Sequence, residues 1–342
     1  MKIEHFAFNL RFKYPFTISR GTKTHQPTFI VSLEQFGEKG YGEAPAITYY
    51  HIPVEKMAAD LENKKQMIEK FSFTEPDRFW HFLHHLIPDN PFLVCALDIA
   101  AWDLYGKLRK KPLYQCWNLK WDNIPLTDYT IGIDTIDKMV EKMLARPWPI
   151  YKIKLGTDHD ADIMRTLRKH TDAILRVDAN SGWTLQQALD ILPALAECGV
   201  EFVEQPLDKE DPDGMRILFE KSPIPLIADE SCVSEQDVEK CYGLFHGINI
   251  KLTKCSGLTP ALRMIQNARK LNMKVMAGGM TESSIGSAAV GHLLPLLDYV
   301  DMDGILLLDE DIATGLKIEN GLAVISGKAG LGVEFTGLTV DR

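Results

Sequence analysis

The sequence predicts an α/β protein: a (β/α)8-type barrel with an α+β capping domain that the N-terminal segment and the C-terminal tail form together. From about residue 124 onward, short apolar runs alternate with amphipathic helical stretches. The polar residues that end these runs recur every 22 residues (Asp229 to Lys251) to 27 residues (Lys251 to Gly278). A strand, a helix and two loops occupy about that length, which indicates repeated strand–helix units. The first third of the chain differs, because strands come first and a block of helices follows, which favours a separate α+β domain.

The length of the chain supports two domains. It has 342 residues, of which 45% are hydrophobic, and a single barrel typically takes about 250 residues. We place the capping domain at residues 1–120, with residues 315–342 folding back onto it. The catalytic barrel is placed at residues 121–314.

The capping domain is predicted to begin with a hairpin. Residues 28–35 form a β-type apolar run, Gly37 and Gly40 mark a turn, and residues 41–43 return. Three helical stretches follow, at residues 54–70, 75–86 and 91–109. The last of them repeats apolar residues at helical spacing.

The barrel strands are expected at eight apolar runs: 126–131, 150–154, 174–178, 201–204, 225–229, 247–251, 273–277 and 303–307. Eight such units in succession predict a closed parallel barrel, whose active site lies at the carboxyl ends of the strands. The alternative is an open doubly wound sheet. That fold would need a glycine-rich phosphate loop after an early strand, and the sequence has none.

Charge and composition restrict the partners. The net charge is −9, which argues against nucleic acid and anionic membranes as partners. The N-terminus has no apolar run of the signal-peptide type, and nowhere do about 18 apolar residues follow one another. The six cysteines are scattered without metal-type spacing, as expected for reduced thiols. We therefore expect a cytoplasmic protein that acts on a small molecule.

Three consecutive predicted strands end in carboxylates, namely Asp178, Glu204 and Asp229. Neighbouring strand ends lie about 5 Å apart, so three anions there would repel one another unless a cation neutralised them. An all-oxygen set favours Mg2+, one ion per chain, with Mn2+ as the alternative. The competing interpretation is that each acid caps a helix or forms a salt bridge at its own turn.

Two lysines flank this acidic group. Lys154 ends the second predicted strand and Lys251 ends the sixth, so their ammonium groups would face each other across the barrel. Lys152 lies two residues earlier and points to the same side as Lys154. A base on each face could remove a proton from a carbon next to a carboxylate and return one from the opposite side. The resulting enediolate would be stabilised by the metal. Alternatively, Lys152 and Lys154 are surface lysines.

Asp301 and Asp303 are expected to open the eighth strand with both carboxylates on one side. Across the barrel mouth they could receive a cationic group such as a substrate ammonium. The alternative is a solvated acidic turn.

Taken in order, the motifs resemble those of the enolase superfamily, muconate-lactonizing subgroup, and within it the dipeptide epimerases. They are Tyr41-Gly42-Glu43-Ala44-Pro45, Ala96-Leu97-Asp98, Ala101-Trp102-Asp103-Leu104, Lys152-Ile153-Lys154, Asp178-Ala179-Asn180, Glu204-Gln205-Pro206, Ala228-Asp229-Glu230-Ser231 and Asn249-Ile250-Lys251-Leu252. The similarity covers nearly the whole chain.

The resemblance implies a role for each candidate residue. It assigns Mg2+ binding to Asp178, Glu204 and Asp229, and acid/base catalysis to Lys154 and Lys251. Lys152 would contact the substrate carboxylate, and Thr130 and Gly279 would line the pocket. Asp301 and Asp303 would bind the α-ammonium of a dipeptide. The implied reaction is epimerisation at the α-carbon of the C-terminal residue. Relatives are often homo-oligomers, so self-association is also compatible with the resemblance.

The capping loop at residues 18–24 bears on the preferred dipeptide, because it resembles a pattern seen in some Ala-Glu epimerases. Arg20 and Lys23 could pair with an acidic side chain, which favours L-Ala-L-Glu and a role in murein peptide metabolism. Alternatively, both are solvated loop cations.

Two other functions compete with dipeptide epimerisation. One is a different reaction of the subgroup, namely that of a cycloisomerase, an o-succinylbenzoate synthase or an N-acylamino acid racemase. These enzymes share the lysines and ligands but give no reason for the Asp301/Asp303 pair. The other is a non-catalytic metal-binding scaffold, which should have lost a lysine or a ligand.

Overall fold

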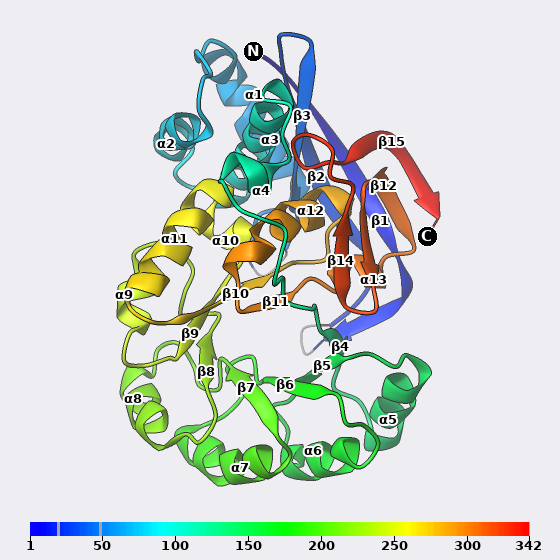
Figure 1. Cartoon of the computed structure of the whole chain (residues 1–342), viewed down its shortest axis with the longest axis vertical. Coiled ribbons are helices and arrows are strands. Elements are labelled where there is room, and N and C mark those ends of the chain that lie inside the picture. Colours follow the sequence, from blue (N-terminus) through cyan, green and yellow to red (C-terminus); the bar gives the residue numbers. More distant parts are fainter. Residues whose placement is uncertain (19–20, 48–49, 342) are drawn as a thin grey trace.

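The computed structural model describes the backbone of residues 1–18, 21–47 and 50–341, and the side chains of these residues apart from 15–18, 21–22 and 338–341 (Figure 1). The barrel occupies the lower and central part of Figure 1, and the capping elements cover one end of it.

The capping sheet has three antiparallel strands in the order β1-β2-β3. They are β1 (Lys2–Ile18), β2 (Gly21–Gln35) and β3 (Glu38–Pro45). The predicted hairpin is present as β2 and β3, and its turn uses positive φ angles at Phe36 and Gly37. We did not predict β1. Its buried residues switch from an odd position to even positions: Ile3 lies in the capping core, whereas Leu10 and Phe12 lie in the barrel core. No single two-residue period of burial therefore marks this strand.

The helices of the capping domain follow this sheet. They are α1 (Val54–Glu69), α2 (Pro76–Leu86), α3 (Pro91–Leu108) and the short α4 (Leu113–Cys116). The first three lie within a residue or so of their predicted bounds. Helix α3 is buried on nearly all sides, because Cys95 and Ile99 pack into the barrel core while Leu97 and Ala100 pack into the capping core. It therefore joins the two domains.

Eight parallel strands form the barrel sheet, each paired with its neighbours in sequence order. They are β4 (Tyr129–Ile131), β5 (Ile150–Lys154), β6 (Ile174–Asp178), β7 (Val200–Glu204), β8 (Leu226–Ala228), β9 (Gly247–Ile250), β10 (Lys274–Gly278) and β11 (Tyr299–Asp301). A parallel bridge between Thr127 and Val300 joins the two edges of the sheet, and the Met302 amide donates to Thr127 Oγ1 at 2.8 Å. This arrangement confirms the predicted fold class.

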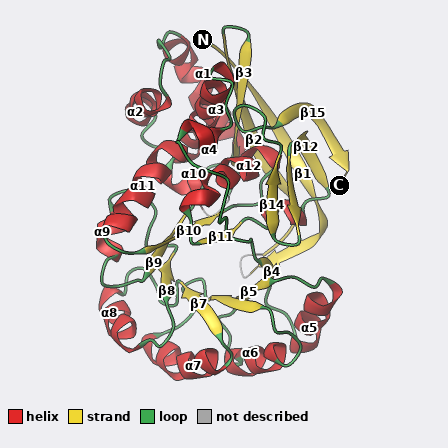
Figure 2. Ribbon diagram, in the orientation of Figure 1, coloured by secondary structure: helices red, strands yellow, loops and turns green. Residues whose placement is uncertain are grey.

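Helices surround the outer face of this sheet (Figure 2). They are α5 (Ile136–Ala145), α6 (Asp160–Arg168), α7 (Leu185–Glu197), α8 (Pro212–Lys221), α9 (Asp237–Cys241), α10 (Leu252–Cys255), α11 (Leu258–Lys270), α12 (Ser284–Leu293) and the 3-10 turn η2 (Leu294–Leu296). Within the described residues, no helix combines the length and the apolar character that a membrane crossing requires.

The eighth strand does not lie at the predicted residues. Residues 303–307 do not form it, since residues 304–307 are the short helix α13 (Gly304–Leu307) and the strand is Tyr299–Asp301. The apolar run Ile305–Leu308 fits a buried strand or a helical turn equally well, and pairing of Gly278 with Asp301 sets the register. Asp301 therefore ends the strand, and Asp303 lies in the loop that follows it.

The C-terminal segment forms β12 (Glu310–Thr314), β13 (Leu316–Glu319), β14 (Leu322–Ile325) and β15 (Glu334–Asp341). Strand β15 pairs with β12, and the ring of Phe335 lies 4.9 Å from that of Tyr41 on β3. The Leu331 amide donates to Asp103 Oδ1 on α3. The tail thus contacts the capping elements, while the exact division at residues 120 and 314 stays a prediction.

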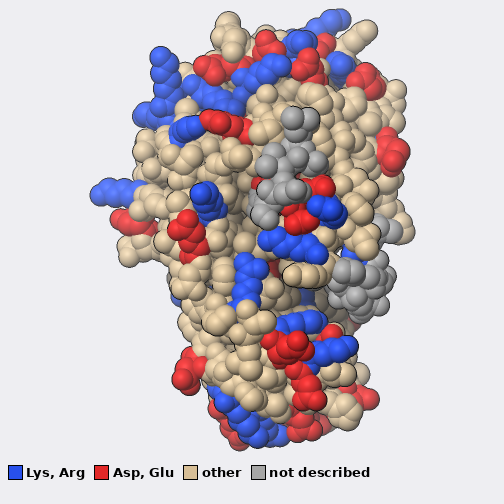
Figure 3. Space-filling model, turned by 90° about the vertical axis from the view of Figure 1, so that its right-hand side faces the viewer, with Lys and Arg blue, Asp and Glu red and all other residues tan. Residues whose placement is uncertain are grey.

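The face of the molecule shown in Figure 3 carries cationic and anionic side chains next to one another. The described part of this face therefore presents mixed charge and no continuous basic stripe.

Candidate functional site

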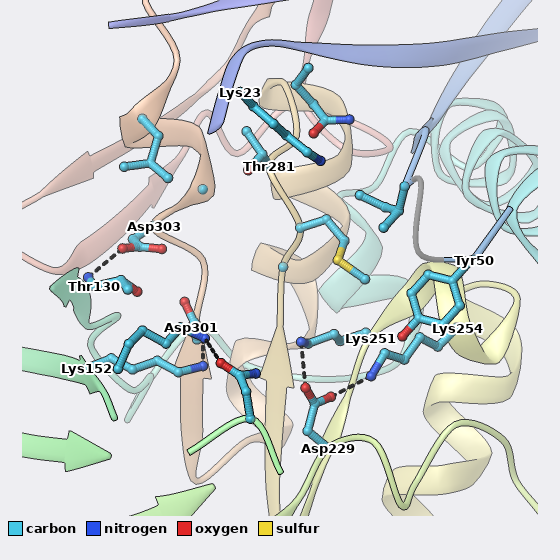
Figure 4. Close-up of a pocket in the computed structure, with 18 of the residues that line it drawn as sticks. Lys23, Tyr50, Thr130, Lys152, Asp229, Lys251, Lys254, Thr281, Asp301 and Asp303 are labelled. Atoms are coloured by element: carbon cyan, nitrogen blue, oxygen red, sulfur yellow. Dashed lines mark hydrogen bonds and ion pairs between the residues drawn. The ribbon is translucent and has the colours of Figure 1, made fainter. Parts of the chain in front are cut away.

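A cavity of about 240 Å³ lies between the carboxyl ends of the barrel strands and the capping sheet. Barrel side chains line its floor, and capping residues such as Lys23 and Tyr50 lie above them (Figure 4). Parallel barrels carry their sites at this end because polar side chains there need not be packed into the core.

The three predicted carboxylates lie together at the floor of this cavity. Asp178 and Glu204 are register partners at the ends of β6 and β7, and Asp229 directly follows β8. All three are at most 1% exposed. Burial of three neighbouring anions is costly unless cations compensate them.

Lysine ammonium groups provide part of that compensation. Lys152 Nζ lies 2.7 to 3.0 Å from Asp301, Glu204 and Asp178. Lys154 Nζ donates to Asp178 at 2.7 Å and to Asn180 Oδ1 at 3.0 Å.

On the other side of the cavity, Asp229 is held by two lysines. Its Oδ2 accepts from Lys251 at 2.8 Å and its Oδ1 from Lys254 at 2.7 Å (Figure 4). We did not single out Lys254 in the sequence. Its position three residues after Lys251 could have indicated it, because residues three apart lie on one face of a helix.

The electrostatics follow from this pairing. Burial by itself lowers the pKa of Lys251, but the negative charges of Asp229 and Glu204 outweigh it and raise the pKa above its usual value. The pKa of Asp229 is lowered, because Lys251 and Lys254 outweigh the effect of its burial. Glu204 behaves differently: burial and the neighbouring Asp178 raise its pKa to about 7.

The donor set fits a divalent cation, although among the described residues no three acidic, His or Cys side chains are grouped as a complete metal centre. Asp178 and Asp229 are instead directed toward lysines. Glu204 Oε2 lies 2.8 Å from Lys152 Nζ, yet it accepts no hydrogen bond of acceptable geometry. An oxygen of a buried carboxylate that accepts no hydrogen bond, next to two further buried carboxylates, matches the oxygen ligands that Mg2+ prefers.

Asp301 and Asp303 line the cavity on the side away from Lys251 (Figure 4). Asp301 accepts from Lys152, and Asp303 Oδ2 accepts from the backbone amide of Thr130 at 2.6 Å. Burial and the charge of Asp301 raise the pKa of Asp303 to about 7. Thr130 thus lies in the cavity wall. Gly279 also lines the cavity, and a Cβ there would meet nothing closer than 3.5 Å.

Of the two capping cations predicted for the substrate side chain, Arg20 lies outside the described residues. Lys23 lines the cavity and is half-buried, and burial lowers its pKa. No described residue forms an ion pair or a hydrogen bond with its ammonium group. Gln26 and Tyr50, which we did not predict, also line the cavity.

Comparisons with known proteins agree with this architecture. Residues 2–116 match the family described as mandelate racemase/muconate lactonizing enzyme, N-terminal domain, and residues 135–338 match the family described as enolase C-terminal domain-like. The two matches together account for most of the chain.

Individual relatives are similar over almost their full length. An L-Ala-D/L-amino acid epimerase of Flavobacterium johnsoniae is 50% identical over 97% of this chain and 99% of its own. An L-Ala-D/L-Glu epimerase of Bacteroides thetaiotaomicron is 38% identical over 97% of this chain and 88% of its own. The crystal structure of a dipeptide epimerase from Cytophaga hutchinsonii, complexed with Mg and D-Ala-L-Val, superposes with a TM-score of 0.90 at 28% identity, covering 97% of this chain and 95% of that one.

These matches confirm the resemblance indicated by the ordered motifs. The chain belongs to the mandelate racemase and muconate lactonizing enzyme family of the enolase superfamily.

Proposed function

We propose that this protein is a Mg2+-dependent dipeptide epimerase, an isomerase that inverts the α-carbon of the C-terminal residue by two-base proton transfer. Its proposed substrate pair is L-Ala-L-Glu and L-Ala-D-Glu, within murein peptide metabolism. Relatives that share 50% and 38% of their residues with this chain are named as epimerases of L-Ala dipeptides, which supports the reaction.

The observation that carries the proposal is the placement of Lys154 and Lys251. They lie at the ends of β5 and β9, the second and sixth strands of an eight-stranded barrel, and both line the same cavity. Side chains at these strand ends approach a bound substrate from opposite faces. One lysine can therefore take the α-proton while the other donates a proton to the opposite face, which inverts the carbon.

Three features of the chain prepare this step. Asp229 and Glu204 raise the pKa of Lys251, so its ammonium group is charged while it is paired with these carboxylates. Lys152 lies beside the acidic cluster, where it can contact the substrate carboxylate. When bound by Asp178, Glu204 and Asp229, Mg2+ would supply positive charge against the developing enediolate.

The substrate's free amine is proposed to bind Asp301 and Asp303. Both carboxylates are largely buried and line the cavity away from Lys251 (Figure 4). An ammonium group there would make charge-assisted hydrogen bonds. Substrates of the related cycloisomerases, synthases and N-acylamino acid racemases carry no such group.

Lys23 supports an acidic second residue, because its half-buried ammonium, with which no described residue pairs, could receive a side-chain carboxylate. Arg20 keeps the same proposed role.

The test is 1H NMR of L-Ala-L-Glu with enzyme and Mg2+ in D2O. Loss of the Glu α-proton signal together with formation of L-Ala-D-Glu would establish the reaction and its acidic preference. Exchange with other dipeptides only would keep the reaction and remove the acidic preference. No exchange with any dipeptide would refute dipeptide epimerisation in favour of another reaction of the family. N-acetyl-L-Ala-L-Glu should not turn over, because it lacks the ammonium group.

A further inference from the structure

Gln26 is a buried polar residue at the wall of the cavity whose orientation is fixed by the backbone. It is 1% exposed, and its Nε2 donates to the carbonyl oxygens of Pro27 at 2.9 Å and Ala46 at 2.8 Å. Carbonyl oxygens can only accept hydrogen bonds, so the amide nitrogen must face them. The side-chain oxygen Oε1 then remains, and no described residue donates to it.

The same wall carries a donor. Lys23 lines the cavity together with Gln26, and no described residue accepts from its Nζ. A ligand group between them would therefore meet one donor, Lys23 Nζ, and one acceptor, Gln26 Oε1. A carboxylate can satisfy the donor alone, whereas a carboxamide has both a carbonyl oxygen and an N–H and can satisfy both. A carboxylate therefore gains a charged pair with Lys23 but leaves Gln26 Oε1 without a donor, whereas an amide pairs with both groups.

The direction in which a bound ligand longer than a dipeptide can extend from the site is also restricted. In the proposed reaction, which this inference rests on, the α-carboxylate stays at the lysines and the α-ammonium at Asp301 and Asp303. A longer substrate can therefore extend only through a side chain, and in an L-Ala dipeptide only the side chain of the second residue has a group to which a further residue can be linked.

A second cavity, of about 560 Å³, borders the first at Lys23. Lys23 lines both cavities, and His25 and Pro27 line the second one. Side chains alternate along a strand, so β2 turns Gln26 toward the first cavity and Lys23 and His25 toward the second, and Lys23 borders the first cavity as well. His51 also lines the second cavity, so three nitrogen-bearing side chains border it.

We propose that the substrate class also includes dipeptides whose second residue carries a side-chain amide: glutamine, or glutamate whose γ-carboxyl group is amide-linked to a further residue. Lys23 donates to the amide carbonyl, Gln26 Oε1 accepts from the amide N–H, and the substituent on the nitrogen enters the second cavity. Gln26 and Lys23 are thus specificity-determining residues of the capping sheet.

The first experiment compares kcat/KM of the Mg2+-loaded wild-type enzyme for four substrates: L-Ala-L-Glu, L-Ala-L-Gln, L-Ala-L-Met and the isopeptide L-Ala-γ-L-Glu-Gly with a free α-carboxylate. L-Ala-L-Gln should lie within about tenfold of L-Ala-L-Glu and about tenfold or more above L-Ala-L-Met, since a satisfied hydrogen bond is worth about that factor. The isopeptide should be epimerised at a rate comparable to L-Ala-L-Gln.

A kcat/KM for L-Ala-L-Gln as low as that for L-Ala-L-Met would overturn the proposed amide site. Turnover of L-Ala-L-Gln with at least 100-fold slower turnover of the isopeptide would overturn the role of the second cavity. If no dipeptide exchanges its α-proton at all, the proposed function fails, and this outcome is distinct from both others.

The second experiment uses variants. Gln26→Met should lower the Gln-to-Glu ratio of kcat/KM about tenfold. Lys23→Met should lower turnover of L-Ala-L-Glu more than that of L-Ala-L-Gln, because a charged pair is lost. Gln35→Met is the matched control: Gln35 lies on the same strand, also donates to a backbone carbonyl, and does not line the cavity. An equal loss for both substrates in Gln26→Met would overturn recognition of the side-chain amide.

Discussion

At the scale of single residues, each proposed catalytic lysine is held by a carboxylate that is also a proposed metal ligand. Lys154 donates to Asp178 and Lys251 donates to Asp229. The same carboxylates cannot serve a lysine and a divalent ion equally well, because both compete for their lone pairs. Metal binding is therefore expected to free the lysines for proton transfer, while Lys254 keeps its contact with the second oxygen of Asp229.

The two-base assignment predicts that epimerisation needs both lysines. Lys154→Ala and Lys251→Ala should each lower epimerisation by about 10² to 10⁴-fold. Each variant retains a base on one face, so a variant can still exchange the α-proton of one stereoisomer but not that of the other. 1H NMR in D2O, with L-Ala-L-Glu and L-Ala-D-Glu supplied separately, measures this. Full epimerisation by either variant would refute the assignment.

The proposed role of Asp303 predicts an effect on substrate affinity and on the pH dependence of kcat/KM. Asp303→Asn keeps the acceptor for the Thr130 amide but removes the charge, so KM for L-Ala-L-Glu should rise roughly 10- to 100-fold. The pKa of Asp303 is raised to about 7, so its carboxylate is ionised above that pH and neutral below it. Steady-state kinetics should show wild-type kcat/KM falling between pH 8 and pH 6.

In the Asp303→Asn variant this part of the pH profile should flatten. The exposed Asp122→Asn serves as the control and should leave both KM and the profile unchanged. Unchanged kinetics in Asp303→Asn would remove its proposed ammonium role.

At the scale of secondary-structure elements, buried carboxylates of the capping domain cap helices of the barrel. Asp98 on α3 accepts from the Thr259 amide at 2.9 Å and from its hydroxyl at 2.6 Å, at the start of α11. Glu43 on β3 accepts from the amides of Ser283 and Gly286 at the start of α12. Free amides at a helix start need such acceptors, so these contacts fix the capping sheet above the barrel.

Asp98→Ala should therefore destabilise the protein by about 1 to 3 kcal/mol, because it leaves a buried amide and a buried hydroxyl without an acceptor. Urea unfolding followed by circular dichroism measures the change, with the exposed Asp122→Ala as the control. Equal stability of the two variants would show that the contact contributes nothing to holding the domains together.

The elements also show where sequence patterns fail. Helices α1 to α3 were predicted closely, because their apolar spacing and length are characteristic of helices. The eighth strand was misplaced by a few residues, because the run Ile305–Leu308 has no distinguishing period. The correction moves Asp301 from the start of a strand to its end, which is the end where the cavity lies.

At the scale of the whole molecule, the cavity belongs to neither domain alone. The barrel contributes Lys251 and Asp303, and the capping sheet contributes Lys23 and Gln26. Chemistry and side-chain recognition are thus divided between the two domains, and the C-terminal tail, through β15, contacts both (Figure 1).

A bound metal should stabilise this assembly. At a Mg2+ concentration 100 times its Kd, the expected gain is about 2.7 kcal/mol of unfolding free energy. Differential scanning fluorimetry with and without EDTA should show a higher Tm with Mg2+, and Glu204→Gln should reduce the shift. Because the pKa of Glu204 is about 7 and binding needs its anion, the shift should be larger at pH 8 than at pH 6. A wild-type Tm that does not change when Mg2+ is added would contradict the proposed metal site.

The sequence by itself determined the repeated strand–helix units, the capping helices and the positions of the charged strand ends. These are local properties. Buried positions recur with a characteristic period along a strand or a helix, and a polar residue at the end of an apolar run can be recognised without knowing which residues lie near it in space. Asp178, Glu204 and Lys154 could therefore be placed correctly relative to one another.

Only the tertiary structure decided which groups meet. Pairing of Lys254 with Asp229, the contact of Lys152 with Asp301, and the two carbonyl oxygens that turn Gln26 Oε1 toward the cavity all join parts of the chain that are distant or differently oriented. Such contacts depend on strand register and on the packing of one domain upon the other. No periodic pattern in the sequence records them, because packing constrains distances in space and not spacings along the chain.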